Sequence, residues 1–256
     1  MKELISILGA GESGVGSAIL AQKQGFDVWV SDFGTIKQTY KDELAEYGIA
    51  YEENGHNEEK ILSSSQIIKS PGIAETIPVL VKAANKSIPI IGEIEFAANY
   101  TTAVLIGITG TNGKTTTTLL THHILQRAGL NVGLAGNVGF SFAKQVALEN
   151  HDYYVLEISS YQLDGMNSVV LDYGVLLNIT PDHLDRYGSI ENYIKSKFRI
   201  NKNQGAEQKF IYCADDETIT NYLRTHQTAA QLIPFTLENT PMENGAWLKN
   251  NEIQMQ

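Results

Sequence analysis

The chain has 256 residues, of which 43% are hydrophobic and 19% are charged, enough for one large domain or two smaller ones with hydrophobic cores. Its formal net charge of −10 excludes the class of nucleic-acid binders that follow the phosphate backbone, because these carry the opposite sign. The single cysteine, Cys213, allows no internal disulfide and fits a reducing compartment. The first apolar run is too short for a signal peptide, and no segment is long and apolar enough to cross a bilayer. We therefore expect a cytoplasmic protein with neither nucleic acid nor a membrane as its partner.

Apolar β-type runs alternate with helical patterns along the chain, which predicts an α/β fold with parallel sheets. In the first part we predict strands at residues 4–8, 27–31, 66–69 and 88–91 and helices at residues 15–24, 40–47 and 77–85. A second strand–turn–helix series begins near residue 102, so we predict a first domain of residues 1–93 and a second of residues 94–256. In the second domain we predict strands at residues 103–106, 153–158, 173–179 and 209–214 and helices at residues 119–125 and 191–201. Residues 236–256 are polar and rich in turn signals, unlike the end of a hydrophobic core.

A strict Gly-x-Gly-x-x-Gly motif runs from Gly9 to Gly14, between the first predicted strand and helix. Asp32 follows the second predicted strand, 18 residues after Gly14. This pattern is typical of a dinucleotide site, where the backbone approaches a diphosphate. The residues themselves leave three interpretations open: a nicotinamide cofactor, another nucleotide diphosphate, or a turn without a ligand.

The most informative stretch is residues 107–118, Gly-Ile-Thr-Gly-Thr-Asn-Gly-Lys-Thr-Thr-Thr-Thr, between a predicted strand and helix. It departs from the strict triphosphate-loop pattern because Ile108 stands where the first glycine is expected. Backbone N–H groups of such a turn bind phosphate oxygens, Lys114 adds a full positive charge, and the Thr115 hydroxyl can hold Mg²⁺. A turn without a ligand is the alternative, but Gly-Lys-Thr at a strand-to-helix junction favours a nucleoside-triphosphate site.

Further candidate metal ligands stand at the ends of predicted strands. Glu157 ends one strand and His183 follows another. Because strand ends of an open α/β sheet meet at one crevice, both could lie near Thr115 and the phosphates, where Mg²⁺ takes oxygen ligands. Taken singly, a solvated glutamate and a structural histidine are the simpler interpretations.

Lys197 lies on the apolar face of the predicted helix at residues 191–201, whereas Lys195 lies on its polar face. An inward lysine commonly extends along its stem to solvent. Near bound Mg²⁺ an ammonium would be repelled, so Lys197 would have to become neutral, pair with an acid, or be modified to an anion.

Five segments taken together resemble the Mur ligases of peptidoglycan synthesis. They are Thr-Gly-Thr-Asn-Gly-Lys-Thr-Thr at 109–116, Gly-Asn-Val-Gly at 136–139, Glu-Ile-Ser-Ser-Tyr-Gln-Leu at 157–163, Asn-Ile-Thr-Pro-Asp-His-Leu-Asp-Arg-Tyr at 178–187 and Lys-Phe-Arg-Ile at 197–200. The resemblance covers essentially all 256 residues. The first domain, with Gly-Ala-Gly-Glu-Ser-Gly at 9–14 and Ser-Pro-Gly-Ile at 70–73, is most similar to the branch that adds D-glutamate to UDP-N-acetylmuramoyl-L-alanine.

The resemblance implies a Rossmann-like domain that binds the UDP-sugar, followed by a P-loop-type α/β domain that binds ATP. Members of the family carry a third domain and an Asn-rich nucleotide-binding stretch, and neither is present here. The chain then corresponds to the N-terminal and central parts of a longer enzyme, so we expect no ligase turnover from it alone.

The resemblance also implies roles for individual residues. The ATP contacts are expected at Gly110, Thr111, Asn112, Gly113, Lys114, Thr115 and Thr116. The UDP-sugar contacts are expected at Gly11, Glu12, Ser13, Gly14, Asp32, Phe33, Ser70, Pro71, Gly72, Asn137, Ser159, Gln162 and His183. Glu12 and Phe33 differ from the residue types usual at the family's uracil pocket. Two Mg²⁺ sites are implied, one at Thr115 and Glu157 and one at His183 and Lys197.

Lys197 matches the family lysine that reacts with CO₂ to become an anionic carbamate, which would resolve the problem of an inward ammonium beside Mg²⁺. The expected catalytic residues are Lys114, Glu157, His183 and the carbamylated Lys197. The implied reaction is ATP-dependent amide formation by a monomer through an acyl phosphate, with ADP and phosphate as products. Three alternatives stay open: a related ligase adding another amino acid, an NAD-dependent oxidoreductase, and a module that only binds UDP-sugar.

Overall fold

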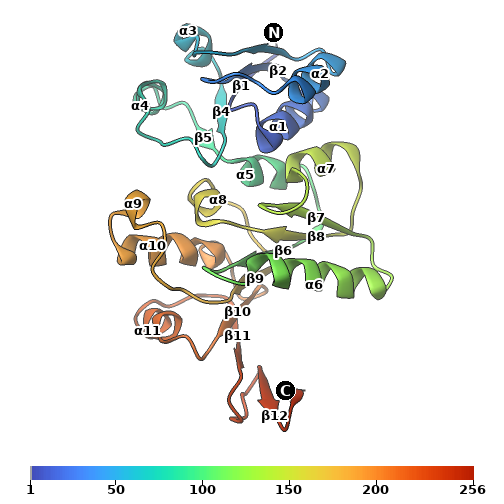
Figure 1. Cartoon of the computed structure of the whole chain (residues 1–256), viewed down its shortest axis with the longest axis vertical. Helices are drawn as coiled ribbons and strands as arrows, with labels where there is room; N and C mark the ends of the chain where they lie inside the picture. Colours follow the sequence, from blue (N-terminus) through green and yellow to red (C-terminus); the bar gives the residue numbers. More distant parts are fainter. Residues whose placement is uncertain (1) are drawn as a thin grey trace. The chain divides into compact units, whose positions relative to one another are not determined.

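The computed structural model describes residues 2–256, which form two compact units. The first unit contains the described residues up to 102 together with residues 139–151 and 164–169. The second unit contains residues 103–138, 152–163 and 170–256. The expected α/β class is confirmed, because each unit is built on a largely parallel sheet with helices beside it (Figure 1).

The sheet of the first unit has five parallel strands in the order β3-β2-β1-β4-β5. Their bounds are Leu4–Leu8 for β1, Asp27–Ser31 for β2, Ala50–Glu52 for β3, Gln66–Lys69 for β4 and Ile90–Ile91 for β5. The helices are α1 (Glu12–Lys23), α2 (Gln38–Glu46), α3 (Glu58–Ile61), α4 (Pro78–Asn85), α5 (Glu93–Ala98) and α7 (Phe142–Leu148). Strands and helices alternate with the order reversing beside β1, which is the doubly wound arrangement of Rossmann-like folds.

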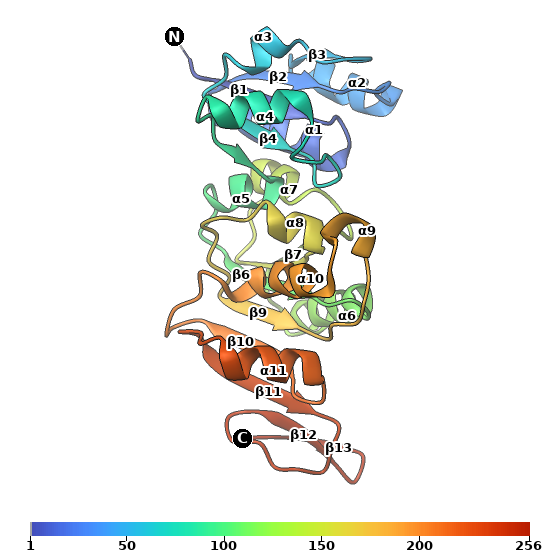
Figure 2. The same ribbon diagram turned by 90° about the vertical axis from the view of Figure 1, so that its left-hand side faces the viewer.

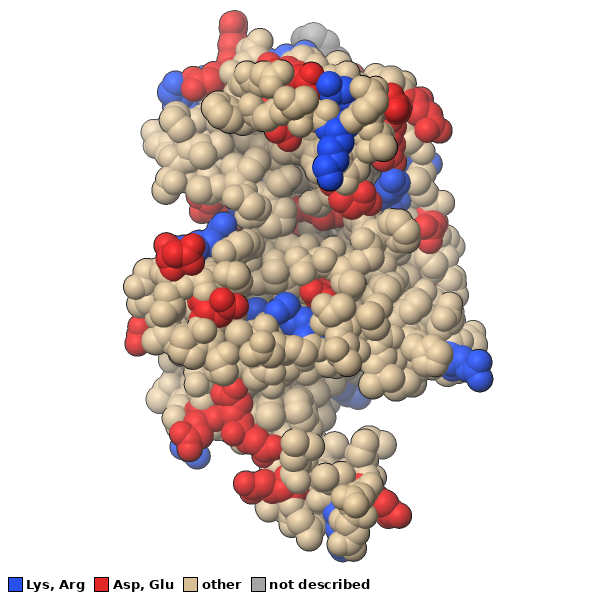
Figure 3. All heavy atoms as spheres, viewed as in Figure 1, with Lys and Arg blue, Asp and Glu red and all other residues tan. Residues whose placement is uncertain are grey.

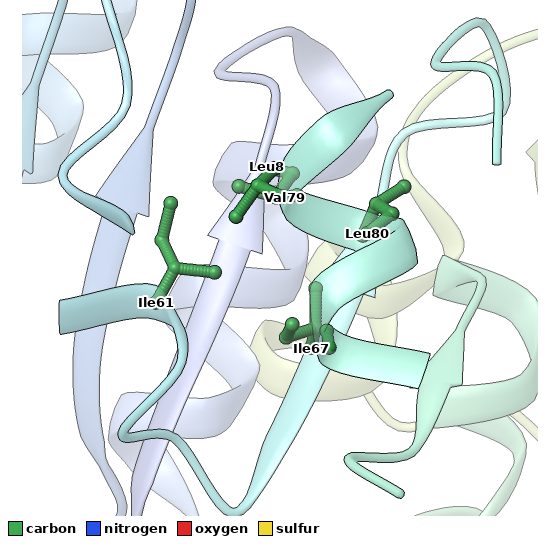
Figure 4. Close-up of a cluster of buried hydrophobic side chains, with 6 residues drawn as sticks. Leu8, Ile61, Ile67, Val79 and Leu80 are labelled. Atoms are coloured by element: carbon green, nitrogen blue, oxygen red, sulfur yellow. The ribbon is translucent and has the colours of Figure 1, made fainter. Parts of the chain in front are cut away.

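One hydrophobic cluster of this unit lies between its strands and helices α3 and α4. Figure 4 shows Leu8 and Ile67 from neighbouring strands facing Ile61, Val79 and Leu80 from the helices. These five side chains are at most 3% exposed. Strands covered on both faces are expected to read as continuous apolar runs, which explains the sequence Leu-Ile-Ser-Ile-Leu of β1.

Two buried carboxylates of α5 hold the later segments of the first unit. Glu93 accepts hydrogen bonds from Ser141 Oγ and from the backbone N of Ala143, at the start of α7. Glu95 accepts from the backbone N atoms of residues 167, 168 and 169 and from Ser168 Oγ. The chain therefore returns twice to the first unit, and each return is fixed by one glutamate. Nothing in the hydrophobic pattern indicated these returns.

The sheet of the second unit has the order β13-β12-β11-β10-β9-β6-β8-β7, parallel except for the last pair, β12 and β13. The strand bounds are Val104–Thr109 for β6, Val132–Gly136 for β7, Tyr153–Glu157 for β8, Tyr173–Leu176 for β9, Lys209–Cys213 for β10, Gln231–Thr236 for β11, Ala246–Lys249 for β12 and Glu252–Met255 for β13. The tail beyond residue 236, expected to be only polar turns, contains this antiparallel pair, joined to β11 through Phe235 and Thr236.

The helices of the second unit lie on both faces of its sheet. They are α6 (Lys114–Arg127), α8 (Ser160–Asp164), α9 (Leu184–Tyr187), α10 (Ile190–Lys197), the 3₁₀ helix η1 (Phe198–Asn201) and α11 (Glu217–Thr225). Helix α6 covers one face, while α10 and α11 cover the other (Figures 1 and 2). The predicted helix at residues 191–201 is thus an α-helix that tightens into η1 after Lys197. No described helix has the length and apolar character needed to cross a membrane.

Glu93 should make the stability of the first unit depend on pH. Burial raises the pKa of Glu93, against the opposing effect of the bonds from Ser141 and the α7 backbone. A carboxyl whose pKa is higher in the folded state stabilises fully below its unfolded pKa, and this contribution is lost as the pH rises through the folded value. We expect Glu93→Gln, relative to the unchanged chain, to become progressively less destabilising as the pH is raised from about 4.5 to 8.

Urea unfolding can follow this unit alone, since the chain has two tryptophans and only Trp29 lies in the first unit. The measurement would use Trp29 fluorescence in a Trp247→Phe background. Glu75→Gln, at an exposed position, serves as the control. A difference between Glu93→Gln and its parent that stays constant over this pH range would contradict the expectation.

Candidate functional site

The loop between β6 and α6 turns sharply at its last residue. Gly113 precedes the first residue of α6, and its φ of 80° lies in the left-handed region. A larger residue would be strained there, because L-residues disfavour that conformation. The turn leads into the N-terminus of α6, whose amides and partial positive charge suit phosphate oxygens. Thr115 and Thr116 follow in the first turn of α6, and both are exposed.

Asn178, just beyond β9, braces this loop. Its backbone O accepts from Thr111 N at 3.0 Å, and its Oδ1 accepts from Asn112 N at 2.8 Å. Its Nδ2 donates to Asn112 O at 3.1 Å. Sequence reasoning did not assign Asn178 a role, because the strand was predicted to run from 173 to 179 and to include it, whereas β9 ends at Leu176. The brace gives the loop a fixed shape before any phosphate arrives.

Lys114 folds back over the same loop. Its Nζ donates to Gly110 O at 3.0 Å and to Thr111 O at 2.9 Å. The ammonium therefore lies against the backbone that a phosphate group would approach. The loop itself therefore positions the Lys114 ammonium, one of the positive charges that a bound triphosphate requires.

Glu157 ends β8 and is only 1% exposed. Asn137 donates from Nδ2 to Glu157 Oε1 at 2.7 Å and from its backbone N to Glu157 O at 2.8 Å. Glu157 Oε2 has no hydrogen-bond partner among residues 2–256. A buried carboxylate oxygen in this state is costly unless a cation or a donor meets it. The side chain therefore fits the role of a Mg²⁺ ligand.

Lys197, the last residue of α10, is 1% exposed and does not extend to solvent. Its Nζ donates to Gly110 O at 2.8 Å and to Thr109 Oγ1 at 3.1 Å. The same Nζ lies 5.4 Å from the ring centroid of Tyr193. Two lysines, Lys114 and Lys197, thus share one carbonyl oxygen at the start of the phosphate loop.

His183 begins α9, and 44% of its side chain is exposed. Its ring centroid lies 5.0 Å from that of Tyr161 and 6.2 Å from that of Tyr193. The Tyr193 hydroxyl lies 3.2 Å from Thr111 Oγ1, so aromatic contacts connect His183 with the phosphate loop. Within residues 2–256, no three His, Cys, Asp or Glu side chains are arranged to hold a metal ion. Glu157 and His183 therefore do not meet a third such ligand in this structure.

Ser159 and Gln162 bond to each other at the start of α8. Ser159 N and Oγ both donate to Gln162 Oε1 at 3.0 Å, and Gln162 N donates to Ser159 Oγ at 3.3 Å. This is a capping box, which the Ser-x-x-Gln spacing could have indicated. Both side chains thus have a structural role besides the substrate contact expected of them.

In the first unit, the glycine turn after β1 is a point of close packing. A Cβ on Gly14 would lie 1.8 Å from Gly9 O, so only glycine allows α1 to begin this near to β1. Asp32 accepts from Ala10 N at 2.7 Å and from Gly34 N at 2.8 Å, one bond at each carboxylate oxygen. The Asp32 side chain therefore fastens the glycine turn to the loop after β2.

An open, mainly apolar pocket of about 880 Å³ lies beside this turn. Of the expected UDP-sugar residues, its wall contains Gly11, Asp32, Phe33, Ser70 and Gly72, and it adds His56, Ile73 and Ile77. The Phe33 side chain is 77% exposed, and its ring centroid lies 5.8 Å from that of His56. Ser31 Oγ lies 2.6 Å from His56 Nδ1, which orients the imidazole. An exposed aromatic ring beside an oriented imidazole at the rim of an apolar pocket suits a planar ligand.

Four further expected contacts belong to the first unit but lie outside this pocket, and Asn137, Ser159, Gln162 and His183 belong to the second unit. Glu12, Ser13, Gly14 and Pro71 are not part of the pocket wall. Glu12 Oε1 instead accepts from Ser141 N at 3.3 Å, so this carboxylate supports the start of α7.

Charges on the molecular surface agree with the composition. On the face drawn in Figure 3, acidic side chains are spread over the second unit's tail and the first unit's outer elements, and basic side chains stand singly or in small groups. This face lacks the extended basic surface that nucleic-acid binding requires.

Asp32 offers a test of the glycine turn. In Asp32→Asn the new Nδ2 cannot accept from either amide, so one backbone N–H loses its partner. We expect the free energy of unfolding of the first unit to fall by about 1–3 kcal/mol. Urea titration followed by Trp29 fluorescence measures it, with Asp42→Asn at an exposed position of α2 as the control. Equal stabilities of the two variants would show that the Asp32 bonds contribute little.

Comparison with known proteins places this geometry in a family. The profile described as Mur ligase middle domain matches residues 108–255, and that described as Mur ligase MurD-like, N-terminal domain, matches residues 3–92. UDP-N-acetylmuramoylalanine–D-glutamate ligase of Porphyromonas gingivalis is 52% identical over 255 residues, 99% of this chain and 57% of the relative. The protein of the same name from Bacteroides fragilis is 54% identical over 237 residues, 92% of this chain and 53% of the relative. The chain thus spans about half the length of the curated relatives that it matches.

Solved structures share the fold. UDP-N-acetylmuramate:L-alanyl-γ-D-glutamyl-meso-diaminopimelate ligase of Neisseria meningitidis superposes with a TM-score of 0.66 at 18% identity, covering 92% of this chain and 78% of that one. UDP-N-acetylmuramate–alanine ligase of Thermotoga maritima gives 0.57 at 19% identity, covering 93% and 53%. Together with the phosphate loop and the glycine-turn pocket, the two profile matches show that this chain belongs to the Mur ligase family.

Proposed function

We propose that this chain supplies the UDP-sugar-binding and ATP-binding parts of an ATP-dependent ligase that joins D-glutamate to UDP-N-acetylmuramoyl-L-alanine. The observation that carries the proposal is the convergence of Lys114 and Lys197 on the carbonyl of Gly110, in a phosphate-type loop. The names of the relatives that are about 50% identical support the choice of substrates. An enzyme that uses ATP and a UDP-linked sugar works in the cytoplasm, and we propose that it acts as a monomer.

In this proposal the β6–α6 loop binds the phosphates of ATP. Backbone N–H groups of residues 113–116, at the N-terminus of α6, would face the phosphate oxygens, whereas Thr111 N and Asn112 N stay bonded to Asn178. Lys114 exchanges its two carbonyl acceptors for the β- and γ-phosphates, so a charged group replaces neutral ones as its partner. The Asn178 brace holds the loop in shape, which reduces the entropy lost on binding.

Glu157 and the exposed Thr115 would hold one Mg²⁺, and His183 with a carbamylated Lys197 would hold or orient a second. Bound Mg²⁺ would supply charge neutralisation between the phosphates and the attacking carboxylate. The unpartnered Glu157 Oε2 supports the first of these roles. Because Asn137 Nδ2 donates to Glu157 Oε1, Oε2 is the oxygen available to bind the metal ion.

The proposed chemistry has two steps. A carboxylate oxygen of the UDP-sugar substrate attacks the γ-phosphorus, the bond to the β–γ bridging oxygen breaks, and ADP leaves. The amine of D-glutamate then attacks the acyl carbon, a proton is released, and phosphate leaves to give the amide. Lys114 stabilises the charge that moves onto the phosphate oxygens, and positioning supplies most of the rate enhancement.

The pocket beside the glycine turn would hold the UDP end of the substrate. Gly11 lets the diphosphate approach the backbone, and Phe33 with His56 offers a surface for a planar base. In a dinucleotide site the acid after the second strand binds the ribose hydroxyl. Here each carboxylate oxygen of Asp32 accepts one backbone N–H group and keeps a second lone pair, so the choice of the UDP-sugar over a nicotinamide cofactor depends on the names of the relatives. The proposed domain division at residue 93 assigns this pocket to the first domain.

ATP binding tests the loop. We expect Lys114→Met to weaken binding of Mg²⁺·ATP to this chain at least tenfold, because a charged partner of the phosphates is lost. Isothermal titration calorimetry measures the affinity, and Lys195→Met, which removes an exposed lysine of α10, is the matched control. Unchanged binding in Lys114→Met would end the assignment of the loop.

The pocket of the first unit has its own test. We expect UDP-N-acetylmuramoyl-L-alanine to bind in calorimetry and Phe33→Ala to weaken it about three- to tenfold through lost stacking. Phe140→Ala serves as the control, because Phe140 is 67% exposed and outside the pocket. Tight NADH binding by fluorescence titration, without binding of the UDP-sugar, would instead support the oxidoreductase alternative. If the chain binds the UDP-sugar but does not bind Mg²⁺·ATP, the isolated chain is a module that only binds the sugar nucleotide.

A further inference from the structure

Thr109 is the last residue of β6, and its side chain is fully buried. Its hydroxyl donates to Ile158 O at 2.7 Å and accepts from Lys197 Nζ at 3.1 Å. A threonine hydroxyl has one proton, so with that proton given to Ile158 O its lone pairs face the ammonium. The orientation of this hydroxyl is therefore fixed by its two partners.

These two bonds join three segments that are distant in the sequence. Ile158 directly follows Glu157, and Ile158 N in turn donates to Ile108 O at 2.9 Å. Lys197 ends α10, 88 residues beyond Thr109. One buried hydroxyl thus ties the phosphate loop to the strand end that carries Glu157 and to the helix end that carries Lys197.

The second acceptor of Lys197 is shared. Gly110 O accepts from Lys197 Nζ at 2.8 Å and from Lys114 Nζ at 3.0 Å. The two ammonium groups at this carbonyl repel each other, and they share the lone pairs of its oxygen. The Thr109 hydroxyl is therefore an acceptor that Lys197 does not share with Lys114.

We infer that Thr109 is a positioning residue for Lys197: together with Gly110 O it forms a resting seat that holds the unmodified ammonium and opposes its conversion to the carbamate. This inference rests on the proposed function, in which Lys197 acts as the carbamate. Thr109 itself touches no substrate in the proposal. It acts through the lysine whose place it sets.

The modification that the seat opposes is chemically simple. The Lys197 amine, after giving one proton to solvent, attacks the carbon of CO₂ with its nitrogen lone pair. A carbon–nitrogen bond forms, one carbon–oxygen π bond opens onto oxygen, and a further N–H proton passes to water. The carbamate nitrogen is uncharged and keeps a single N–H, so it can donate to only one of Thr109 Oγ1 and Gly110 O.

Removal of the seat should favour the carbamate. Thr109→Val keeps the shape of the side chain and removes the hydroxyl, so the ammonium loses one of its acceptors, while the single N–H of the carbamate can still donate to Gly110 O. A hydrogen bond to a charged group corresponds to roughly a tenfold or larger change in an equilibrium constant. We expect Thr109→Val to reach half-maximal labelling of Lys197 at about one tenth of the bicarbonate concentration needed by the unchanged chain. Thr109→Ser, which restores the hydroxyl, should return this concentration to within about twofold of the unchanged value.

The experiment is ¹³C NMR of the chain titrated with ¹³C-bicarbonate at one fixed pH, with Lys197→Arg to identify the Lys197 carbamate signal. Thr118→Val is the matched control. Thr118 is also a fully buried threonine of the second unit, and its Oγ1 has no hydrogen-bond partner among the described residues. Its replacement should leave the bicarbonate requirement unchanged. Urea unfolding verifies that each variant is folded.

A Thr109→Val chain that needs as much bicarbonate as Thr118→Val, or more, overturns the inference, and so does the absence of a Lys197 signal in every variant. Binding of Mg²⁺·ATP, measured on the same samples, separates this result from a failure of the proposed function. A bicarbonate requirement that depends on Thr109 in a chain that does not bind ATP would support the seat and refute the ligase assignment. Normal ATP binding, together with no effect of Thr109 on the bicarbonate requirement, would support the ATP site and refute the inference about Thr109.

Discussion

The register between β6 and its two neighbours is the constraint on which the candidate site depends. It aligns Ile108 with Glu157 of β8 and with Val175 of β9. The three strands therefore end together, and the segments that follow them meet at one edge: the phosphate loop, the α8 cap and the Asn178 brace. A shift of one residue in this register would turn Glu157 to the opposite face of the sheet. The chemistry of the site is thus set by backbone pairing before any side chain is considered.

Buried polar groups determine the rest of the arrangement, and nearly all of them have partners. Glu93 and Glu95 both extend from the first turn of α5 and accept from backbone amides of two different later segments. Such carboxylates are costly to bury unless they are satisfied, so they specify where the chain returns more strictly than apolar contacts do. Glu157 Oε2 is one of several buried side-chain atoms without a hydrogen-bond partner among the described residues, and it stands at the proposed cation site. A buried polar atom without a hydrogen-bond partner is expected at a position where a ligand supplies the missing partner.

Much of the fold was predictable because its signals are local. The strands at 4–8, 27–31 and 66–69 coincide with β1, β2 and β4, since buried parallel strands read as short apolar runs. The helices were less well bounded: α6 begins at Lys114 rather than at 119, because threonines and a lysine carry no apolar signal. The short elements β3, α3, α8 and α9 were missed for the same reason.

Contacts between residues that are distant in the sequence could not be predicted from the sequence alone. The Asn178 brace, the seat of Lys197 on Thr109 and the participation of His56 in the pocket join residues tens of positions apart. The positions of Lys114 and Lys197 beside the loop agree with their expected roles, and those roles stay predictions. The pocket wall includes Phe33 and excludes Glu12, although both were expected beside the same ligand. Glu12 begins α1 and Phe33 lies in the loop after β2, and only the tertiary structure shows which of the two side chains faces the cavity.

The antiparallel pair at the C-terminal end leaves β13 as an outer strand of the eight-stranded sheet. Ile253 and Met255 of this strand are 75% and 81% exposed, and Leu237 in the connection before it is 75% exposed. An outer strand with free main-chain groups and apolar side chains is a template onto which a further strand can add. This edge of the second unit is therefore a place where one copy of the chain can pair, strand against strand, with another.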